Sequence, residues 1–592
     1  STVQSHTITD YSNQAWAFRA MDDATMRSAN PWLYTDPDKA NSLPVSVLPV
    51  GGFYRETKYS MESYDFRATA SYNNVFGEDH IVNLFGGMET NAVNREKTWF
   101  NGVGMQYEMG MLPSYDYLYF KQGNEENAGY YSVDRTRQRE VSFFGTGTYS
   151  YKGRYTLNGT VRYEGSNKLG KSRKARWLPT WNVSAAWNAH EEEFWQSFRD
   201  VVSNMTLKAS YSLTADRGPA SVSNSKAIIN SYNTWRPFTS VKESGLILSS
   251  VENSELTYEK KHELNIGAEI GFIDNRINIE ADWYTRNNFD LIGLIYTKGT
   301  GGQLAKFANV ASMKSSGVEF TVSTRNIKTK DFSWNTDFIF SHTKNEVTDL
   351  QSNASVMDMI SGNGFAMEGY PVRALFSMDF QGLDENGYPT FINEKGQLTV
   401  SDINFQEQLK KDHLVYEGPT DPTMTGSLGN IFRYKGFTLN AFITYSFGNV
   451  IRLDPVFHNV YSDLDAMPRE FINRWTTGGD EKVTNVPVIA DKRANQQDPY
   501  LSYAYNAYNY STERIAKGDF IRMKELSLSY NFPKKMISRL KVNDLSLKIQ
   551  ATNLFLIYSD KKLNGQDPEF FNTGGVASPV PRQFTLTLRL GI

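Results

Sequence analysis

The residues that could bind a metal ion are scattered along the chain. Cysteine is absent, and the seven histidines lie at positions 6, 80, 190, 262, 342, 413 and 458, without a metal-ligand spacing. The stretch DENG, residues 384–387, begins like a calcium-binding loop, but the later ligands and the closing glutamate of such a loop are missing. We therefore expect a turn there, and no bound metal or cofactor.

Motifs for covalent chemistry are also missing from the sequence. It contains no HExxH zinc motif, no GxSxG nucleophile elbow and no glycine-rich phosphate loop. A glycan hydrolase would need two carboxylates about 5–10 Å apart in a groove, and 65 acidic residues leave that alternative open. We predict a protein that is not an enzyme, with a β-rich surface glycan hydrolase as the alternative, and assign no catalytic residue.

Three groups of side chains could instead bind a solute, a partner or lipid. Charged residues that alternate with apolar ones could line a transport path or form ion pairs: Arg67, Arg154, Arg162 and Glu164. Aromatic residues in long connections could stack on sugars or pack together: Trp235, Phe238, Tyr370 and Phe376. The basic stretch SRKARW, Ser172–Trp177, could meet lipopolysaccharide phosphates or remain a solvated loop. Pairing and packing are the simpler expectations, so the substrate-binding residues are left unassigned.

Alternating strands must position these side chains. Residues 63–74 place Tyr64, Phe66 and Tyr72 on one face and polar residues on the other, which is the two-residue period of a strand with one apolar face. The last ten residues, QFTLTLRLGI, alternate in the same way. So do residues 154–164, 205–214, 264–272, 277–283, 332–340, 437–447 and 545–551. The fold is therefore predicted to be all-β.

The aromatic spacing on the apolar faces favours a membrane barrel over a soluble sandwich. Eight residues separate two aromatics on five strands: Tyr64/Tyr72, Phe143/Tyr151, Tyr155/Tyr163, Phe332/Phe340 and Phe437/Tyr445. At a rise of about 3.3 Å and a tilt of about 40°, eight residues cover roughly 20 Å of the membrane normal. This is close to the apolar band of about 25 Å between aromatic girdles, whereas rings in a sandwich would follow the packing of a second sheet. We expect the apolar faces to contact lipid.

Short and long connections alternate along the chain. Short turns are expected at 77–79, 152–153, 274–275, 326–331 and 435–436, and long segments at 91–139, 215–260, 343–425 and 448–517. This alternation is typical of an outer-membrane barrel with periplasmic turns and long extracellular loops. Counting back from Ile592 gives about sixteen antiparallel strands, the first near residues 3–9. The net charge of −3 gives no sign of nucleic-acid binding.

A series of motifs resembles the SusC/RagA-type TonB-dependent outer-membrane transporters of Bacteroidetes. The matching stretches are residues 255–284, 309–320, 421–443, 474–488, 518–535, 551–570 and 581–592. Tyr258 stands where these proteins carry a tryptophan, and Ile592 replaces their usual terminal phenylalanine. The stretch GLDENGYPTFINEKG, residues 382–396, has a form that other members also carry.

The resemblance implies active import of large nutrients, oligosaccharides or oligopeptides, across the outer membrane of a Gram-negative bacterium. A SusD-type surface lipoprotein would cap the barrel, and the TonB complex would supply energy. A siderophore-type TonB-dependent receptor is an alternative. Members form barrels of about 22 strands around an amino-terminal plug. Residues 1–592 are therefore expected to be the carboxy-terminal part of such a barrel, with the plug and first strands absent and the polar-face charges paired with the plug or with each other.

The first and last strands bear on this organisation. An open sheet edge in lipid leaves backbone groups unsatisfied, each at a cost of several kcal/mol. The strand near residues 3–9 and the strand at 584–592 are therefore expected to pair with polypeptide outside this chain. Pairing between these two strands would instead indicate a closed sixteen-stranded pore.

Overall fold

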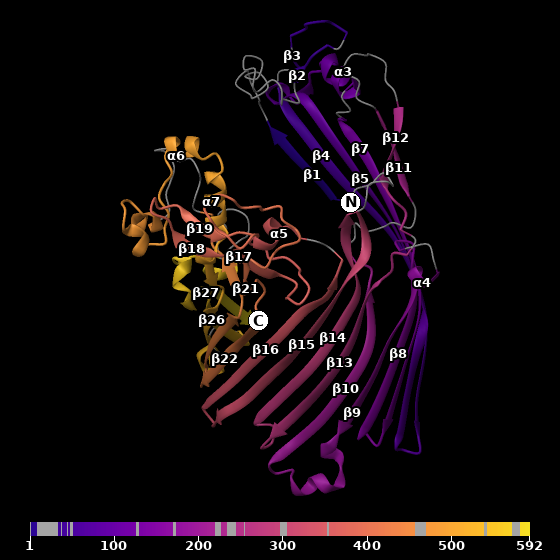
Figure 1. Cartoon of the computed structure of the whole chain (residues 1–592). Helices are drawn as coiled ribbons and strands as arrows, with labels where there is room; N and C mark the ends of the chain where they lie inside the picture. The colour runs from indigo at the N-terminus through magenta and orange to yellow at the C-terminus, as the bar shows by residue number, and fades with distance from the viewer. Residues whose placement is uncertain are drawn as a thin grey trace.

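One antiparallel sheet dominates the computed structural model (Figure 1). The structure describes residues 2–8, 33–36, 38–43, 45–47, 51–125, 129–169, 173–218, 227–233, 244–253, 255–296, 305–351, 354–455, 469–537, 542–570 and 581–591. Sixteen strands follow one another in pairing order: β1 (Thr2–Ile8), β4 (Gly52–Phe76), β5 (His80–Gln106), β7 (Tyr131–Tyr151), β8 (Tyr155–Ser166), β9 (Trp177–Asn188), β10 (Val202–Asp216), β13 (Glu259–Phe272), β14 (Ile277–Tyr296), β15 (Ala305–Lys328), β16 (Phe332–Leu350), β22 (Met424–Tyr434), β23 (Phe437–Phe447), β26 (Phe520–Asn531), β27 (Asp544–Ser559) and β28 (Gln583–Gly591). The expected number of strands is confirmed.

Smaller elements lie in the long connections at one end of the strands and in some of the turns at the other end. The strands among them are β2 (Leu33–Tyr34), β3 (Val45–Ser46), β6 (Leu112–Pro113), β11 (Ile228–Asn233), β12 (Ser244–Ser250), β17 (Ala374–Met378), β18 (Phe380–Leu383), β19 (Pro389–Ile392), β20 (Leu398–Thr399), β21 (Leu414–Pro419), β24 (Val450–Arg452) and β25 (Ile515–Lys517). The α-helices are α3 (Tyr117–Glu125), α4 (Arg173–Arg176), α5 (Val356–Ile360), α6 (Lys492–Gln497), α7 (Leu501–Asn509) and α8 (Lys534–Ile537). The 3-10 helices are η1 (Tyr107–Met109), η2 (Ala189–Glu191), η3 (Glu193–Ser197), η4 (Arg469–Asn473), η5 (Asp480–Lys482), η6 (Thr512–Arg514), η8 (Lys561–Leu563) and η9 (Pro568–Phe570). Within the described segments, every helix is too short or too polar to cross a bilayer.

Short turns join neighbouring strands at one end of the sheet, where the sequence predicts them. Glu78, Lys152, Asp274 and Lys435 adopt positive φ angles of 65°, 53°, 54° and 51°. Each lies in a tight reversal between two consecutive strands, where the left-handed conformation lets the chain turn back within a few residues. The turn between β15 and β16 is shorter than expected, because β15 continues to Lys328.

The prediction of a long loop at residues 91–139 is wrong. β5 continues to Gln106, β7 begins at Tyr131, and residues 80–100 pair with 131–151 in continuous register. Figure 1 shows β4, β5 and β7 rising well beyond the strands at the other end of the sheet. The strands were missed because the alternation of apolar residues that lipid requires stops at the membrane surface, whereas the backbone pairing continues above it.

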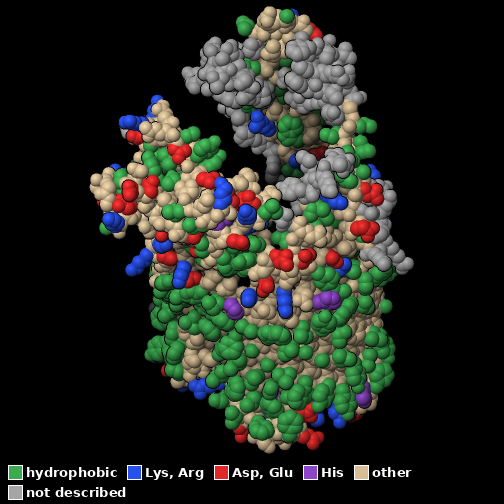
Figure 2. Space-filling model, viewed as in Figure 1, with side chains coloured by type: hydrophobic (Ala, Val, Ile, Leu, Met, Phe, Trp, Pro, Cys, Tyr) green, Lys and Arg blue, Asp and Glu red, His purple; other side chains and the backbone are tan. Residues whose placement is uncertain are grey.

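The apolar face of the sheet is exposed in the part of the chain that the structure describes. Hydrophobic side chains form a continuous area over the lower half of the molecule in Figure 2, and charged side chains gather above this area and at its lower edge. Tyr64 is 64% exposed, and Leu586 of β28 is 70% exposed. The buried hydrophobic core lies elsewhere, between the long connections described below. Such a surface needs an apolar environment, as expected for contact with lipid.

The two end strands of the sheet have different neighbours. β1 pairs with β4 over Thr2–Ile8, and β28 pairs with β27 over Gln583–Gly591. Among the described residues, no register joins β28 to β1, and Ile592 lies outside them. Within the described ranges, the sixteen strands therefore do not close into the alternative sixteen-stranded ring.

Gly426 of β22 allows a close approach between three strands. The hydroxyl of Tyr445, which is paired with Gly426, donates to the carbonyl oxygen of Ile339 at 2.9 Å. A Cβ atom at position 426 would overlap both of these oxygens. We expect Gly426→Ala to lower the free energy of unfolding by about 1–3 kcal/mol, measured by denaturant titration in lipid vesicles. Gly159→Ala is the control, since a Cβ there meets nothing within 4 Å; equal losses would contradict the steric argument.

Candidate functional site

Ion pairs cross the polar face of the sheet from β4 to the end of β10. Arg162 lies 3.9 Å from Glu89 and 2.8 Å from Glu164, so that it bridges two strands. The complete network is Arg67, Glu89, Arg162, Glu164, Arg217 and Glu140. Three arginines and three glutamates cancel in charge. Arg162 and Glu164 pair with each other, as one part of the prediction has it, whereas Arg67 pairs with Glu89, which the sequence analysis did not single out.

Arg154 lies apart from this network. It follows the turn between β7 and β8, and its guanidinium is 3.0 Å from Glu192. Tyr155 also donates its hydroxyl to Glu192, and the combined hydrogen bonds lower the pKa of this carboxyl. Arg154 therefore anchors the segment around η2 and η3 at the turn end of the sheet, and it does not share a site with the other three predicted residues.

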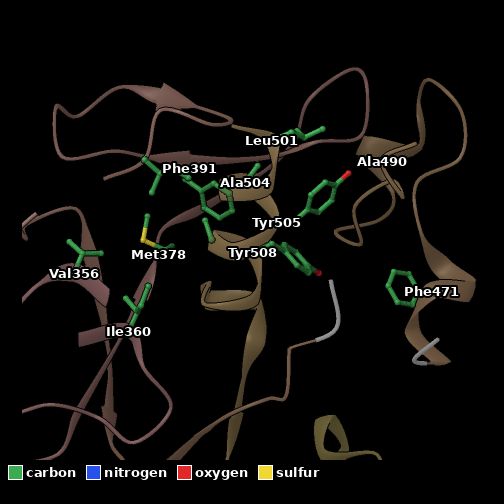
Figure 3. Packing of buried hydrophobic residues seen from close by; sticks show 12 residues of the cluster. Val356, Ile360, Met378, Phe391, Phe471, Ala490, Leu501, Ala504, Tyr505 and Tyr508 are labelled. Atoms are coloured by element: carbon green, nitrogen blue, oxygen red, sulfur yellow. The ribbon is translucent and has the colours of Figure 1, made fainter. Parts of the chain in front are cut away.

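Two long connections fold together into an outer-loop domain, which we define as residues 354–419 and 450–517 as far as they are described. Its hydrophobic core is shown in Figure 3 and includes Val356, Met378 and Phe391 from the first connection. The second connection contributes α7, whose Leu501, Tyr505 and related residues recur at the spacing of a helix with one apolar face. The sequence predicted long segments here but not their common core.

Arg452 joins the parts of this domain. It is 3% exposed, and its guanidinium donates to the carbonyl oxygens of Ser511 at 2.8 Å, Phe376 at 2.6 Å and Ile360 at 3.3 Å. Burial lowers the pKa of Arg452 to about 10, which still leaves it protonated at neutral pH. Burial also raises the pKa of the neighbouring Glu417 carboxyl, against the attraction of Arg452. A buried cation held mainly by backbone carbonyls thus ties both connections together.

The DENG stretch is a turn, as expected. The carboxylate of Asp384 accepts hydrogen bonds from the backbone N–H groups of Asn386 and Tyr388 at 2.9 Å and 2.8 Å, and Gly387 has a φ of +79°. The Trp475 ring packs directly on Gly387, where a Cβ would overlap it. Throughout the described ranges, no group of three or more His, Cys, Asp or Glu residues could hold a metal ion. The turn therefore serves as a docking point for the second connection.

The remaining predicted residues pack against protein or fall outside the described chain. Tyr370 lies 5.1 Å from Phe376 and 4.9 Å from Tyr416 between ring centroids, which confirms packing. Trp235, Phe238 and Ser172 lie outside the described residues. In the SRKARW stretch, residues 173–176 form α4, and Trp177 stacks on Tyr163 of β8 at 5.0 Å.

A polar cavity of about 650 Å³ lies where the outer-loop domain meets β22, β23 and β26. Arg373, Lys524 and Glu569 supply both signs of charge to its lining, and Asn363 and Thr444 supply neutral hydrogen-bonding groups. The Glu569 side chain is held in place, because the nearby buried Arg522 pairs with it at 2.9 Å. A cavity of this size and polarity fits a small section of a polar oligomer. It is the best candidate for a ligand site, and sequence reasoning missed it because residues from five separate segments form it.

Comparison with known proteins identifies the sheet. The family described as TonB-dependent receptor-like β-barrel matches residues 4–465. The chain belongs to this family. The receptor is therefore a large outer-membrane β-barrel protein of a Gram-negative bacterium.

Individual relatives agree with this assignment. The receptor is 24% identical over 538 residues to TonB-dependent receptor P3 of Formosa agariphila, covering 87% of this chain and 49% of the relative. It is 26% identical over 479 residues to TonB-dependent receptor SusC of Bacteroides thetaiotaomicron, covering 77% and 44%. The structure of the RagAB peptide transporter matches with a TM-score of 0.73 and 21% identity, covering 91% of this chain and 56% of that one. The SusC/RagA resemblance is confirmed, and the chain spans about half the length of these curated relatives.

Proposed function

We propose that the receptor imports oligosaccharides or oligopeptides across the outer membrane, as the barrel part of a TonB-dependent importer capped by a SusD-type surface lipoprotein. The observation that carries this proposal is the outer-loop domain with its polar cavity. A domain with its own core gives a lid a firm surface at the outer end of the barrel. The names of the relatives SusC and RagAB peptide transporter support the same class of activity.

The open edges of the sheet support a composite barrel. β1 and β28 each present one unpaired side among the described residues, and such edges are costly in lipid. In the proposed importer, further strands and a plug complete the ring, and TonB acts on that polypeptide. The network from Arg67 to Glu140, which has no net charge, then faces the plug. Import proceeds by substrate binding and gating, without a covalent step.

The cavity explains how one wall could accept either substrate class. Lys524 can bind a peptide carboxylate, and Glu569, which also pairs with Arg522, can accept hydrogen bonds from an amine or from sugar hydroxyls. Because the lining carries both charged and neutral hydrogen-bonding groups, it suits either substrate class.

Uptake by intact cells tests this proposal. A strain that lacks the receptor should lose uptake of labelled oligosaccharides or oligopeptides and retain uptake of ferric siderophores. The receptor purified in detergent should also carry a SusD-type lipoprotein. Loss of ferric siderophore uptake alone would overturn the proposal in favour of the siderophore-type alternative.

A further inference from the structure

Three arginines lie on the apolar side of β7, where the strand leaves the membrane. Side chains alternate along a strand, and β7 pairs with β5 from residue 131 to 151 without a bulge. Arg135, Arg137 and Arg139 therefore point to the same side as Phe143, which is 49% exposed on the apolar face. Their neighbours in the sequence, including Glu140, point to the polar side.

The height of these arginines follows from the register. Arg139 pairs with Ala92, and Ala92 pairs with Tyr64, so that Arg139 lies in the cross-strand row of a predicted girdle tyrosine. Two residues below it, Val141 continues the apolar face. The arginine row thus starts at the level of the lipid headgroups and rises outward by about 3.3 Å per residue along the strand.

The acidic neighbours neutralise only part of this row. Arg135 is 2.7 Å from Glu96. Arg139 donates to the carbonyl oxygens of Val93 and Gln138 and to the side-chain oxygen of Asn94, all of which are uncharged.

Arg137 is exposed, and within the described part of the chain it takes part in no ion pair. Glu62, the next acidic residue in its row, belongs to β4, two strands away. At about 4.8 Å per strand, the separation is about 10 Å. Two positive charges therefore remain, one of them held in place by neutral acceptors.

We propose that Arg137 and Arg139 bind a phosphate group of the glycolipid in the outer leaflet, whose acyl chains lie on the apolar face below. A guanidinium presents paired N–H donors that match phosphate oxygens. Alternate residues of a strand are about 6.6 Å apart, so two such side chains can converge on one phosphate. The apolar residues directly beneath them favour a lipid over a free anion, because a lipid alone would fill both parts of this surface.

Native mass spectrometry of the purified receptor in nanodiscs tests the proposal. One set of nanodiscs contains monophosphorylated lipid A, and a second set contains the same lipid A after dephosphorylation. The native receptor should retain the phosphorylated form at least about tenfold better, and Arg137→Gln/Arg139→Gln should lose this preference. Arg95→Gln is the matched control: Arg95 lies at the same height on the polar side, paired with Thr136, and should bind like the native receptor.

Three outcomes would overturn the proposal: equal retention of both lipids by the native receptor, undiminished preference in the double variant, or the same loss in Arg95→Gln. Full competition by an equal concentration of inorganic phosphate would also overturn it, because a free anion would then be the ligand. Arg137→Gln alone keeps the test valid if the double variant folds poorly, since the Arg137 side chain takes part in no hydrogen bond or ion pair with any described residue. This single change should remove about half of the binding free energy that the double variant loses.

Discussion

Replacing Arg452 with methionine should release the outer-loop domain, with a loss of about 3–5 kcal/mol in its stability. The substitution removes a buried cation and its hydrogen bonds to the carbonyl oxygens of Ile360, Phe376 and Ser511, of which the Ser511 oxygen keeps a second donor in the backbone N–H of Arg514. Hydrogen exchange should show the loss directly, as faster exchange of the β17 amides at residues 374–378. Because the pKa of Arg452 is about 10, the effect should not change between about pH 6 and 8.

Two further variants make this test specific. Arg373→Met removes an ion pair with Asp421 at 2.7 Å in which both side chains are about half exposed, so it should cost at most about 1 kcal/mol. Arg452→Lys keeps the charge but loses the planar fork, and should fall between the native protein and Arg452→Met. If Arg373→Met and Arg452→Met accelerated hydrogen exchange equally, Arg452 would not be the residue that holds the two connections together.

Placing a charge on the lipid side of β10 should destabilise the barrel by about 2–4 kcal/mol. Ala209 lies on the apolar face, paired with Ala185 on one side and Ile266 on the other. All three line a shallow apolar groove of about 1050 Å³. In Ala209→Arg the guanidinium would have to remain in hydrocarbon or bend towards the headgroups. Denaturant titration in lipid vesicles measures the change.

The neighbouring residue supplies the control for this charge. Ser210 points to the polar side and pairs with Ser184 and Asn265, so Ser210→Arg should cost well under half as much. Equal losses, or a larger loss for Ser210→Arg, would reverse the assignment of the two faces of the sheet.

The membrane strands were predictable because lipid imposes a local rule on every second residue. β23 begins and ends where the alternation predicts, at Phe437 and Phe447. The DENG turn was equally accessible, since its hydrogen bonds connect residues within four positions of Asp384. Above the membrane this rule ends, and the outer part of β5 and β7 was therefore interpreted as a loop.

The outer-loop domain could not be derived in the same way, because its contacts join distant parts of the chain. Arg452 follows Val450 and Ile451, and nothing local distinguishes it from a charged residue at the end of a short apolar run. Its three acceptors lie 59, 76 and 92 residues away. The polar cavity has the same origin, since Asn363, Thr444 and Glu569 come from three separate segments.

β4 and β5 form part of the barrel wall, and their length also makes the sheet project beyond the membrane. The two strands contain 25 and 27 residues, whereas crossing the membrane takes about 9–11. At about 3.3 Å per residue, roughly 50 Å of paired strand extends past the bilayer, and Figure 1 shows its far end standing clear of the outer-loop domain. An antiparallel ladder is stiff along its strands. The receptor therefore carries a projecting extension of its sheet on the cell surface. An antibody or a bacteriophage approaching the cell would contact the end of this extension before it reached the mouth of the barrel.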